Sequence, residues 1–225
     1  MRNSLLQVDD LLRGRGRFSG ETIAAGGIRA LLIFVITFGT FYGAVMGTYT
    51  GLAPDRAHQL LYSGVKVPLF LLVTFALCLP SFFVANTIAG LRQDFGEALQ
   101  AVVAAQACVT VVLACLAPVT GLLYLSISSY RLAVMVNGVM FAAASFASQI
   151  VLRRHYAPLI RKSSKHRFML HAWLVFYIFV GIQMGWVLRP FIGAPGSPVR
   201  FFRDDAWGNA YVVLARLILS ILGGR

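Results

Sequence analysis

The chain has 225 residues, of which 58% are hydrophobic and 12% charged, and 20 Lys and Arg against 8 Asp and Glu give a formal net charge of +12. This composition excludes a soluble globular domain with its own core and predicts one integral membrane domain over residues 1–225. The positive charge does not indicate nucleic-acid binding, because the basic residues lie beside the apolar stretches, where they meet anionic head groups.

The N-terminal residues 1–20 are predicted to form a cytoplasmic interfacial segment. Within it, residues 4–13 have the pattern of a short amphipathic helix, whose apolar face carries Leu5, Val8 and Leu12. The alternative is a frayed tail, because a helix this short is marginal by itself. No continuous apolar region follows the start of the chain, so we expect no cleavable signal peptide.

Five apolar stretches follow, each long enough to cross the hydrocarbon core as a helix. They lack the alternation of barrel strands, so the predicted fold class is an all-α membrane protein with a bundle of five transmembrane helices over 28–222. The predicted spans are 28–49, 67–89, 98–123, 132–152 and 168–187. A short sixth segment, 207–222, carries Arg216 in its middle and either crosses the membrane, tilts through it or lies at its interface.

The distribution of Lys and Arg predicts the orientation. With the N-terminus in the cytoplasm, 13 of the 20 residues lie on the inner side if the sixth segment crosses, six lie on the outer side, and Arg216 lies within that segment. This predicts a multi-pass protein of a bacterial inner membrane, although the arginines of 189–203 oppose the rule. The largest contribution comes from a predicted polybasic cytoplasmic loop, 153–167, which serves as a topology anchor or binds an acidic partner. Its basic residues are Arg153, Arg154, Arg161, Lys162, Lys165 and Arg167.

The first span contains a ridge of small residues, Gly39, Gly43 and Gly47. Residues four apart lie on one face of a helix, and glycines there allow a second backbone to approach closely. The ridge is therefore predicted to be a helix-packing surface. Its partner is either another span of the same chain, which we favour, or another subunit.

Polar side chains are few within the spans. The amides Asn86, Gln106, Asn137, Gln149 and Gln183 are predicted to form hydrogen bonds between helices. No Asp or Glu falls in the middle of a strong span, which argues against ion-coupled transport. The three cysteines have no metal-site spacing, and no catalytic motif is present, so we expect no cofactor, no metal and no enzymatic activity.

The stretch 183–203 is rich in Pro, Gly, Arg and aromatic residues. Pro190 is expected to stop the fifth helix, and the later prolines are expected to force a turn and an extended path. Such a rigid loop is predicted to dock over the bundle or to present a surface to a partner. The predicted partner or lipid contacts are Trp186, Arg189, Arg200, Phe201, Phe202 and Arg203.

Two parts of the chain together resemble known proteins. The residues Lys66-Val67-Pro68, Leu79-Pro80 and Asn86, with the run Trp-Val-Leu-Arg-Pro-Phe-Ile-Gly at 186–193, resemble a family of small bacterial polytopic membrane proteins without a settled activity. The layout of five spans with a cytoplasmic N-terminus is similar to the Yip1-type membrane proteins. That resemblance implies a role in membrane trafficking or organisation. The Asp-Leu-Tyr-Gly-Pro motif of the Yip1-type proteins is absent, and no functional residue carries over.

These observations lead to one main functional hypothesis and two alternatives. The main hypothesis is a non-enzymatic accessory or scaffold subunit, or a membrane-organising protein, that contacts membrane lipids and either other membrane subunits or a second copy of itself. The first alternative is a channel or carrier for a small solute or lipid, with a path lined by Asn86, Gln106 and Asn137 through proline-broken spans. The second is an intramembrane enzyme, for which the spans lack the residue types.

Overall fold

A computed structural model describes residues 25–51, 56–194, 196, 198–203, 206 and 208–213. The predicted interfacial segment 1–20 lies outside the described residues. So does most of the sixth segment, of which only the start is described, with residues 210–213 helical. The question of whether that segment crosses the membrane therefore stays open.

All the regular secondary structure of the described residues is helical, which confirms the predicted all-α class. Five of them are long and apolar enough to cross a membrane. They are α2 (Ala25–Gly47), α3 (Ala57–Ile88), α4 (Phe95–Ser126), α5 (Tyr130–Lys162) and α6 (Lys165–Leu188). Two short 3-10 helices, η2 (Thr48–Thr50) and η4 (Arg92–Asp94), follow α2 and precede α4.

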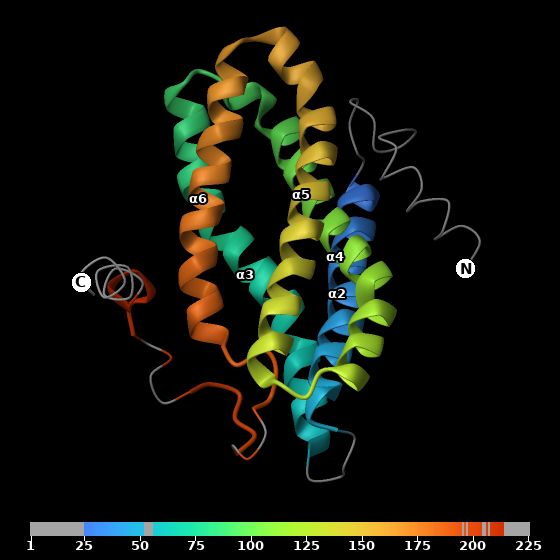
Figure 1. The fold of residues 1–225 in the computed structure, drawn as a ribbon. Helices are drawn as coiled ribbons and strands as arrows, with labels where there is room; N and C mark the ends of the chain where they lie inside the picture. Colours follow the sequence, from blue (N-terminus) through green and yellow to red (C-terminus); the bar gives the residue numbers. More distant parts are fainter. Residues whose placement is uncertain are drawn as a thin grey trace, which may run out of the picture.

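The helices form a bundle in which chain neighbours are not always the closest neighbours (Figure 1). Helix α2 packs against α3 and α4, α4 packs against α5, and α3 packs against α6. The pairs α3–α4 and α5–α6 make far fewer contacts, although each pair is consecutive in the chain. The turns α3–α4 and α5–α6 lie at one end of the bundle, and the turn α4–α5 and the end of α6 lie toward the other (Figure 1).

Two helices extend well beyond their apolar stretches. Helix α3 begins ten residues before the predicted span 67–89, and α5 continues ten residues past the predicted end at 152. The added turns have polar faces, but they bury side chains such as Ser63, Tyr156 and Leu159. Hydropathy marks the part of a helix that suits lipid, whereas backbone hydrogen bonds and packing decide where the helix ends.

The interior consists of two apolar clusters. One joins α2, α3, α4 and α5 to Ile192, and the other joins the ends of α3, α4, α5 and α6 around Phe82 and Trp173. Helix α4 is the most enclosed span, whereas the outer faces of α5 and α6 carry exposed apolar side chains such as Phe146 (74% exposed) and Phe168 (70%). Large apolar side chains on the outside of a bundle are expected where lipid is the solvent.

The glycine ridge of α2 packs against α3 of the same chain. A Cβ atom at Gly43 would lie 2.3 Å from the backbone oxygen of Ser63, and one at Gly47 would lie 2.6 Å from Cα of Leu60. At Gly39 the nearest atom, Cβ of Pro68, would lie at 3.4 Å, which is a tight but tolerable distance. The close contact is therefore internal, as we favoured from the sequence.

The prolines do not break the spans. Helix α3 continues through Pro68 and Pro80, and α4 continues through Pro118. The description of these spans as proline-broken is therefore wrong. Neighbouring helices support the backbone around a proline in a membrane bundle, so the helix persists despite the missing N–H.

Replacement of Gly43 by Ala is expected to destabilise the bundle, because the new Cβ collides with the backbone of α3 rather than with a flexible side chain. Overpacking of this kind costs about 1–3 kcal/mol in the free energy of unfolding. The matched control is Gly138→Ala in α5, where a Cβ meets nothing within 4 Å. Denaturant titration in mixed micelles measures both variants, and equal stability of the two would contradict the assigned packing.

Candidate functional site

Residues 189–194, which we call the strap, leave the end of α6 and run over the first turns of α3. The strap has no helical hydrogen bonds of its own, yet four of its carbonyl oxygens accept bonds from side chains of α3, of α5 and of Arg56, which directly precedes α3. These bonds are Lys66 Nζ to Pro190 (2.7 Å), Ser63 Oγ to Phe191 (2.5 Å), Tyr130 Oη to Ile192 (3.3 Å) and Arg56 Nη1 to Ala194 (3.4 Å). The strap is thus held through its backbone.

We call the side chains that hold the strap the clamp: Arg56, Ser63, Lys66 and Tyr130, with Gln59 bonded to Ser63. The spacing of its residues in and before α3 explains why they act together. Positions 56, 59, 63 and 66 are three or four residues apart and therefore share one face of a helical stretch. Gln59 Nε2 donates to Ser63 Oγ at 2.9 Å, which leaves the hydroxyl proton of Ser63 to bond the strap. A Cβ at Gly193 would lie 2.9 Å from the Gln59 side chain, so a glycine allows the close approach.

Lys66 is the most unusual residue of the clamp, because its side chain is a fully buried cation. Its ammonium group bonds the Pro190 oxygen and lies 5.0 Å from the centroid of the Phe201 ring. Among the described residues, no carboxylate pairs with it. A buried charge is costly unless dipoles or an aromatic face stabilise it, so the position of Lys66 depends on the strap and on Phe201.

Apolar contacts add to the clamp. The ring of Phe191 packs edge-on against Phe70 of α3 at 5.9 Å, and Ile192 is 4% exposed within the apolar cluster of α2, α3 and α4. The prediction that this loop docks over the bundle agrees with this geometry.

The six predicted partner or lipid contacts divide into two groups. The Arg189 guanidinium stacks 3.1 Å from the centroid of the Trp186 ring, and Phe201 packs edge-on against Tyr62 of α3, so these side chains are partly buried. The other three are exposed and follow the strap in the chain: Arg200, Phe202 and Arg203.

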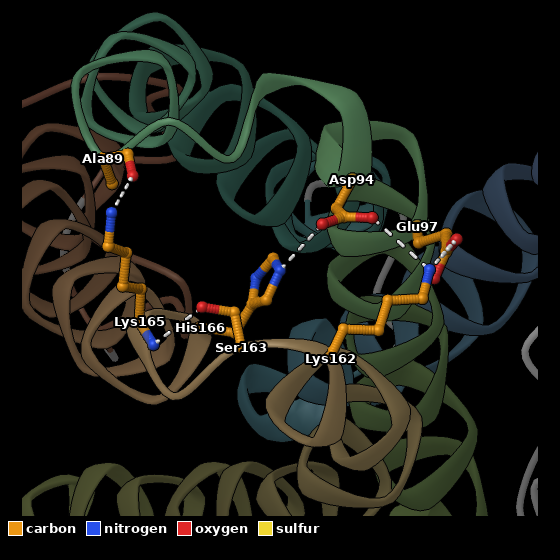
Figure 2. A network of polar contacts seen from close by, with 7 residues as sticks. All are labelled: Ala89, Asp94, Glu97, Lys162, Ser163, Lys165 and His166. Atoms are coloured by element: carbon orange, nitrogen blue, oxygen red, sulfur yellow. Dashed lines mark hydrogen bonds and ion pairs between the residues drawn. The ribbon is translucent and has the colours of Figure 1, made fainter.

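A polar network lies at the opposite end of the bundle, where the turn α3–α4 meets the turn α5–α6 (Figure 2). Lys162 Nζ pairs with Glu97 at 2.6 Å and with Asp94 at 3.3 Å. The second oxygen of Asp94 lies 3.1 Å from Nε2 of His166, whose side chain is fully buried. Lys165 Nζ donates to the backbone oxygen of Ala89 at 3.1 Å. The network joins the two turns at the ends of the packed pairs α3–α6 and α4–α5.

The predicted polybasic loop 153–167 is not a loop. Arg153, Arg154, Arg161 and Lys162 belong to α5, Lys165 and Arg167 belong to α6, and only 163–164 link the two helices. The helix persists because Tyr156 and Leu159 pack into the apolar cluster on the inner side of α5. The arginines of this region are exposed on the outer side.

The amides within the spans do not line a common path. Asn137 bonds Tyr42 and Tyr124 in the α2–α4–α5 cluster, Gln106 accepts from Tyr177 of α6, and Asn86 donates to Phe82 of its own helix. A small hollow between α2, α3 and α4 contains Gln106 as its one amide, and its other lining residues are apolar. The predicted interhelical role thus holds for Gln106 and Asn137, whereas the donated bond of Asn86 stays within its helix.

The remaining amides behave differently. Gln183 holds the chain after residue 206, because its Nε2 donates to the Gly208 oxygen and its Oε1 accepts from the Ala210 nitrogen. The side-chain oxygen of Gln149 is buried in α5 and has no hydrogen-bond partner among the described residues. Among those residues, no three His, Cys, Asp or Glu side chains lie together where they could hold a metal.

Sequence reasoning assigns no site role to two important side chains. Lys66 lies just before the predicted span 67–89 and His166 lies within the predicted loop 153–167, although both are fully buried in helices. For Lys66 the spacing with positions 59 and 63 was a usable signal, because it places three polar residues on one helical face. For His166 no local signal exists, since its partner Asp94 lies 72 residues away in the chain.

Comparison with family models, with curated proteins and with solved structures finds no match for this chain.

Replacement of Lys66 by Met is expected to loosen the strap, because the Pro190 oxygen loses its donor while the apolar volume stays similar. Faster amide hydrogen exchange over 191–194 measures the change. The matched control is Lys165→Met, which also removes a lysine-to-carbonyl bond, but at an exposed position at the other end. If both variants leave exchange in the strap unchanged, the clamp does not hold it.

Replacement of Asp94 by Asn is expected to lower the melting temperature more than Glu97→Gln does. Asp94 contacts both Lys162 and the buried His166, whereas Glu97 contacts the exposed Lys162 alone. An exposed ion pair contributes little to stability, so the difference between the two variants reports the His166 contact. Thermal unfolding of the two variants in the same detergent checks this, and an equal loss would contradict it.

Proposed function

We propose that this protein is a non-enzymatic accessory or scaffold subunit of a larger membrane assembly and that residues 198–203 form its partner-facing surface. The observation that carries the proposal is the clamp, in which four strap carbonyls are bonded by side chains of α3, of α5 and of Arg56 just before α3. A segment that serves only as a connection does not need a buried lysine and a buried glutamine to hold its backbone.

Pre-organisation explains how the clamp serves binding. A surface that is already ordered loses less conformational entropy when a partner binds. Phe201 is anchored on Tyr62 and Lys66, and its neighbours Arg200, Phe202 and Arg203 are exposed beside this anchor. Arginine and aromatic side chains are enriched at the centres of protein interfaces.

The buried polar groups support a structural role rather than catalysis. At the strap end Gln59, Ser63 and Lys66 are engaged with each other and with the backbone. At the opposite end Asp94 and Lys162 are engaged in the ion-pair network. The glycine ridge is also used within the chain, so the proposed partner binds elsewhere.

The proposed setting is a bacterial inner membrane, with the polar network and the N-terminus on the cytoplasmic side. The excess of basic residues toward that end supports this orientation. The likeness to Yip1-type and other small polytopic membrane proteins stays a prediction and is compatible with a membrane-organising role. No observation among the described residues favours the channel or carrier hypothesis, since its three amides lie in separate contacts.

Site-specific photo-crosslinking in the native membrane tests the proposal. A photoreactive residue at position 202 is expected to give one discrete crosslinked product, which then identifies the partner. The matched control is position 146, because Phe146 is also an exposed aromatic but lies on the lipid-facing side of α5. The clamp variant Lys66→Met is expected to weaken the product from position 202 as the strap loosens.

Two results would overturn the proposal. One is crosslinking to lipid alone from position 202, and the other is a single unpartnered copy of the protein after gentle extraction from its membrane. A product that appears equally from positions 202 and 146 would reflect crowding rather than a docking surface.

A further inference from the structure

The network end of the bundle contains more positive charge than its own carboxylates can neutralise. Its two described acids, Asp94 and Glu97, are both engaged, the first by Lys162 and His166 and the second by Lys162. No carboxylate of the described part of this end therefore remains for the arginines around it.

Four arginines at this end are exposed, and their guanidinium groups make no hydrogen bond or ion pair among the described residues. They come from three elements, namely Arg92 in η4, Arg153 and Arg161 in α5, and Arg167 in α6. A guanidinium group presents a planar fork of donors that matches a phosphate well. The structure thus leaves four phosphate-binding groups without an anion from the protein.

Apolar side chains beside these arginines define the kind of anion. In the chain, Ile88 (82% exposed) lies four residues before Arg92, Ile150 (45%) lies three residues before Arg153, and Phe168 (70%) follows Arg167. Three of the four arginines therefore have an exposed apolar residue of a membrane-spanning helix close to them in the sequence. A ligand that binds both the guanidinium groups and the apolar side chains has an anionic head and an apolar tail.

We propose that this end of the bundle binds anionic phospholipids through Arg92, Arg153, Arg161 and Arg167. The polar network has a supporting role, because Lys162 pairs with both Asp94 and Glu97 and so weakens their repulsion of the lipid phosphate. This surface is separate from residues 198–203, so the proposal does not depend on the proposed partner surface.

Native mass spectrometry of the full chain in mild detergent tests the proposal, with phosphatidylglycerol and phosphatidylcholine as probes. The wild type is expected to retain phosphatidylglycerol over phosphatidylcholine. Each Arg→Gln change among the four is expected to weaken that retention about fivefold, as for one charge at an anionic surface. The matched control is Arg131→Gln, an exposed arginine at the opposite end of α5, which is expected to leave retention unchanged.

A second variant tests the supporting role of the polar network. Lys162→Gln is expected to weaken phosphatidylglycerol retention, because Glu97 and Asp94 lose their cation and repel the head group. Thermal unfolding identifies variants that fail to fold. If Lys162→Gln is one of them, the single changes Arg153→Gln and Arg167→Gln are compared with the wild type instead. Equal retention of both lipids by the wild type, unchanged retention in the Arg→Gln variants, or displacement of the lipid by inorganic phosphate would overturn the proposal.

Discussion

The close contact between the glycine ridge of α2 and the backbone of α3 is the constraint on which the rest of this structure depends. Gly43 and Gly47 face the turn of α3 that carries Gln59 and Ser63, and these two side chains take part in holding the strap. Lipid tails are as apolar as leucine, so helices in a bilayer are held by close packing and polar contacts rather than by hydrophobic burial. A bulkier residue in the ridge would move α3 together with the clamp. The packing of α2 against α3 therefore also determines where the strap lies.

The clamp also shows how irregular backbone is accommodated beside membrane helices. A helix satisfies its own carbonyl groups, whereas a non-helical segment needs donors from its surroundings. Here the donors are side chains of α3 and α5, and one of them is the buried ammonium group of Lys66. The charge and the strap stabilise each other, because the lysine satisfies a carbonyl oxygen while the carbonyl and the Phe201 ring offset the cost of burying the lysine. The exposed surface around Phe202 is thus held in place by the clamped strap and by Phe201.

At the opposite end of the bundle, ion pairs and hydrogen bonds between side chains join the helices. Helix α3 packs against α6 and α4 packs against α5, and Asp94, Lys162 and His166 join the two turns at the ends of these pairs. The same bonds occupy the described acids of that end, whereas Arg92, Arg153, Arg161 and Arg167 remain for the proposed phospholipid. One set of ion pairs therefore contributes to the fold and sets the charge of a membrane-facing surface. The two ends of the bundle therefore differ: side chains hold an irregular backbone segment at one end, and exposed arginines surround an ion-pair network at the other.

The sequence by itself determined the all-α class, the five spans and the packing role of the glycine ridge, because apolar length and residue spacing are local properties that a helix in lipid obeys. It also indicated a rigid loop around 190. The tertiary structure alone decided that 153–167 is helical except at 163–164, that α3 starts ten residues before its apolar run, and that Lys66 and His166 are buried. Each of these depends on groups far apart in the chain, such as Lys66 with Pro190 or His166 with Asp94. A hydropathy pattern records which solvent a segment prefers, but not which distant carbonyl or carboxylate meets its polar side chains.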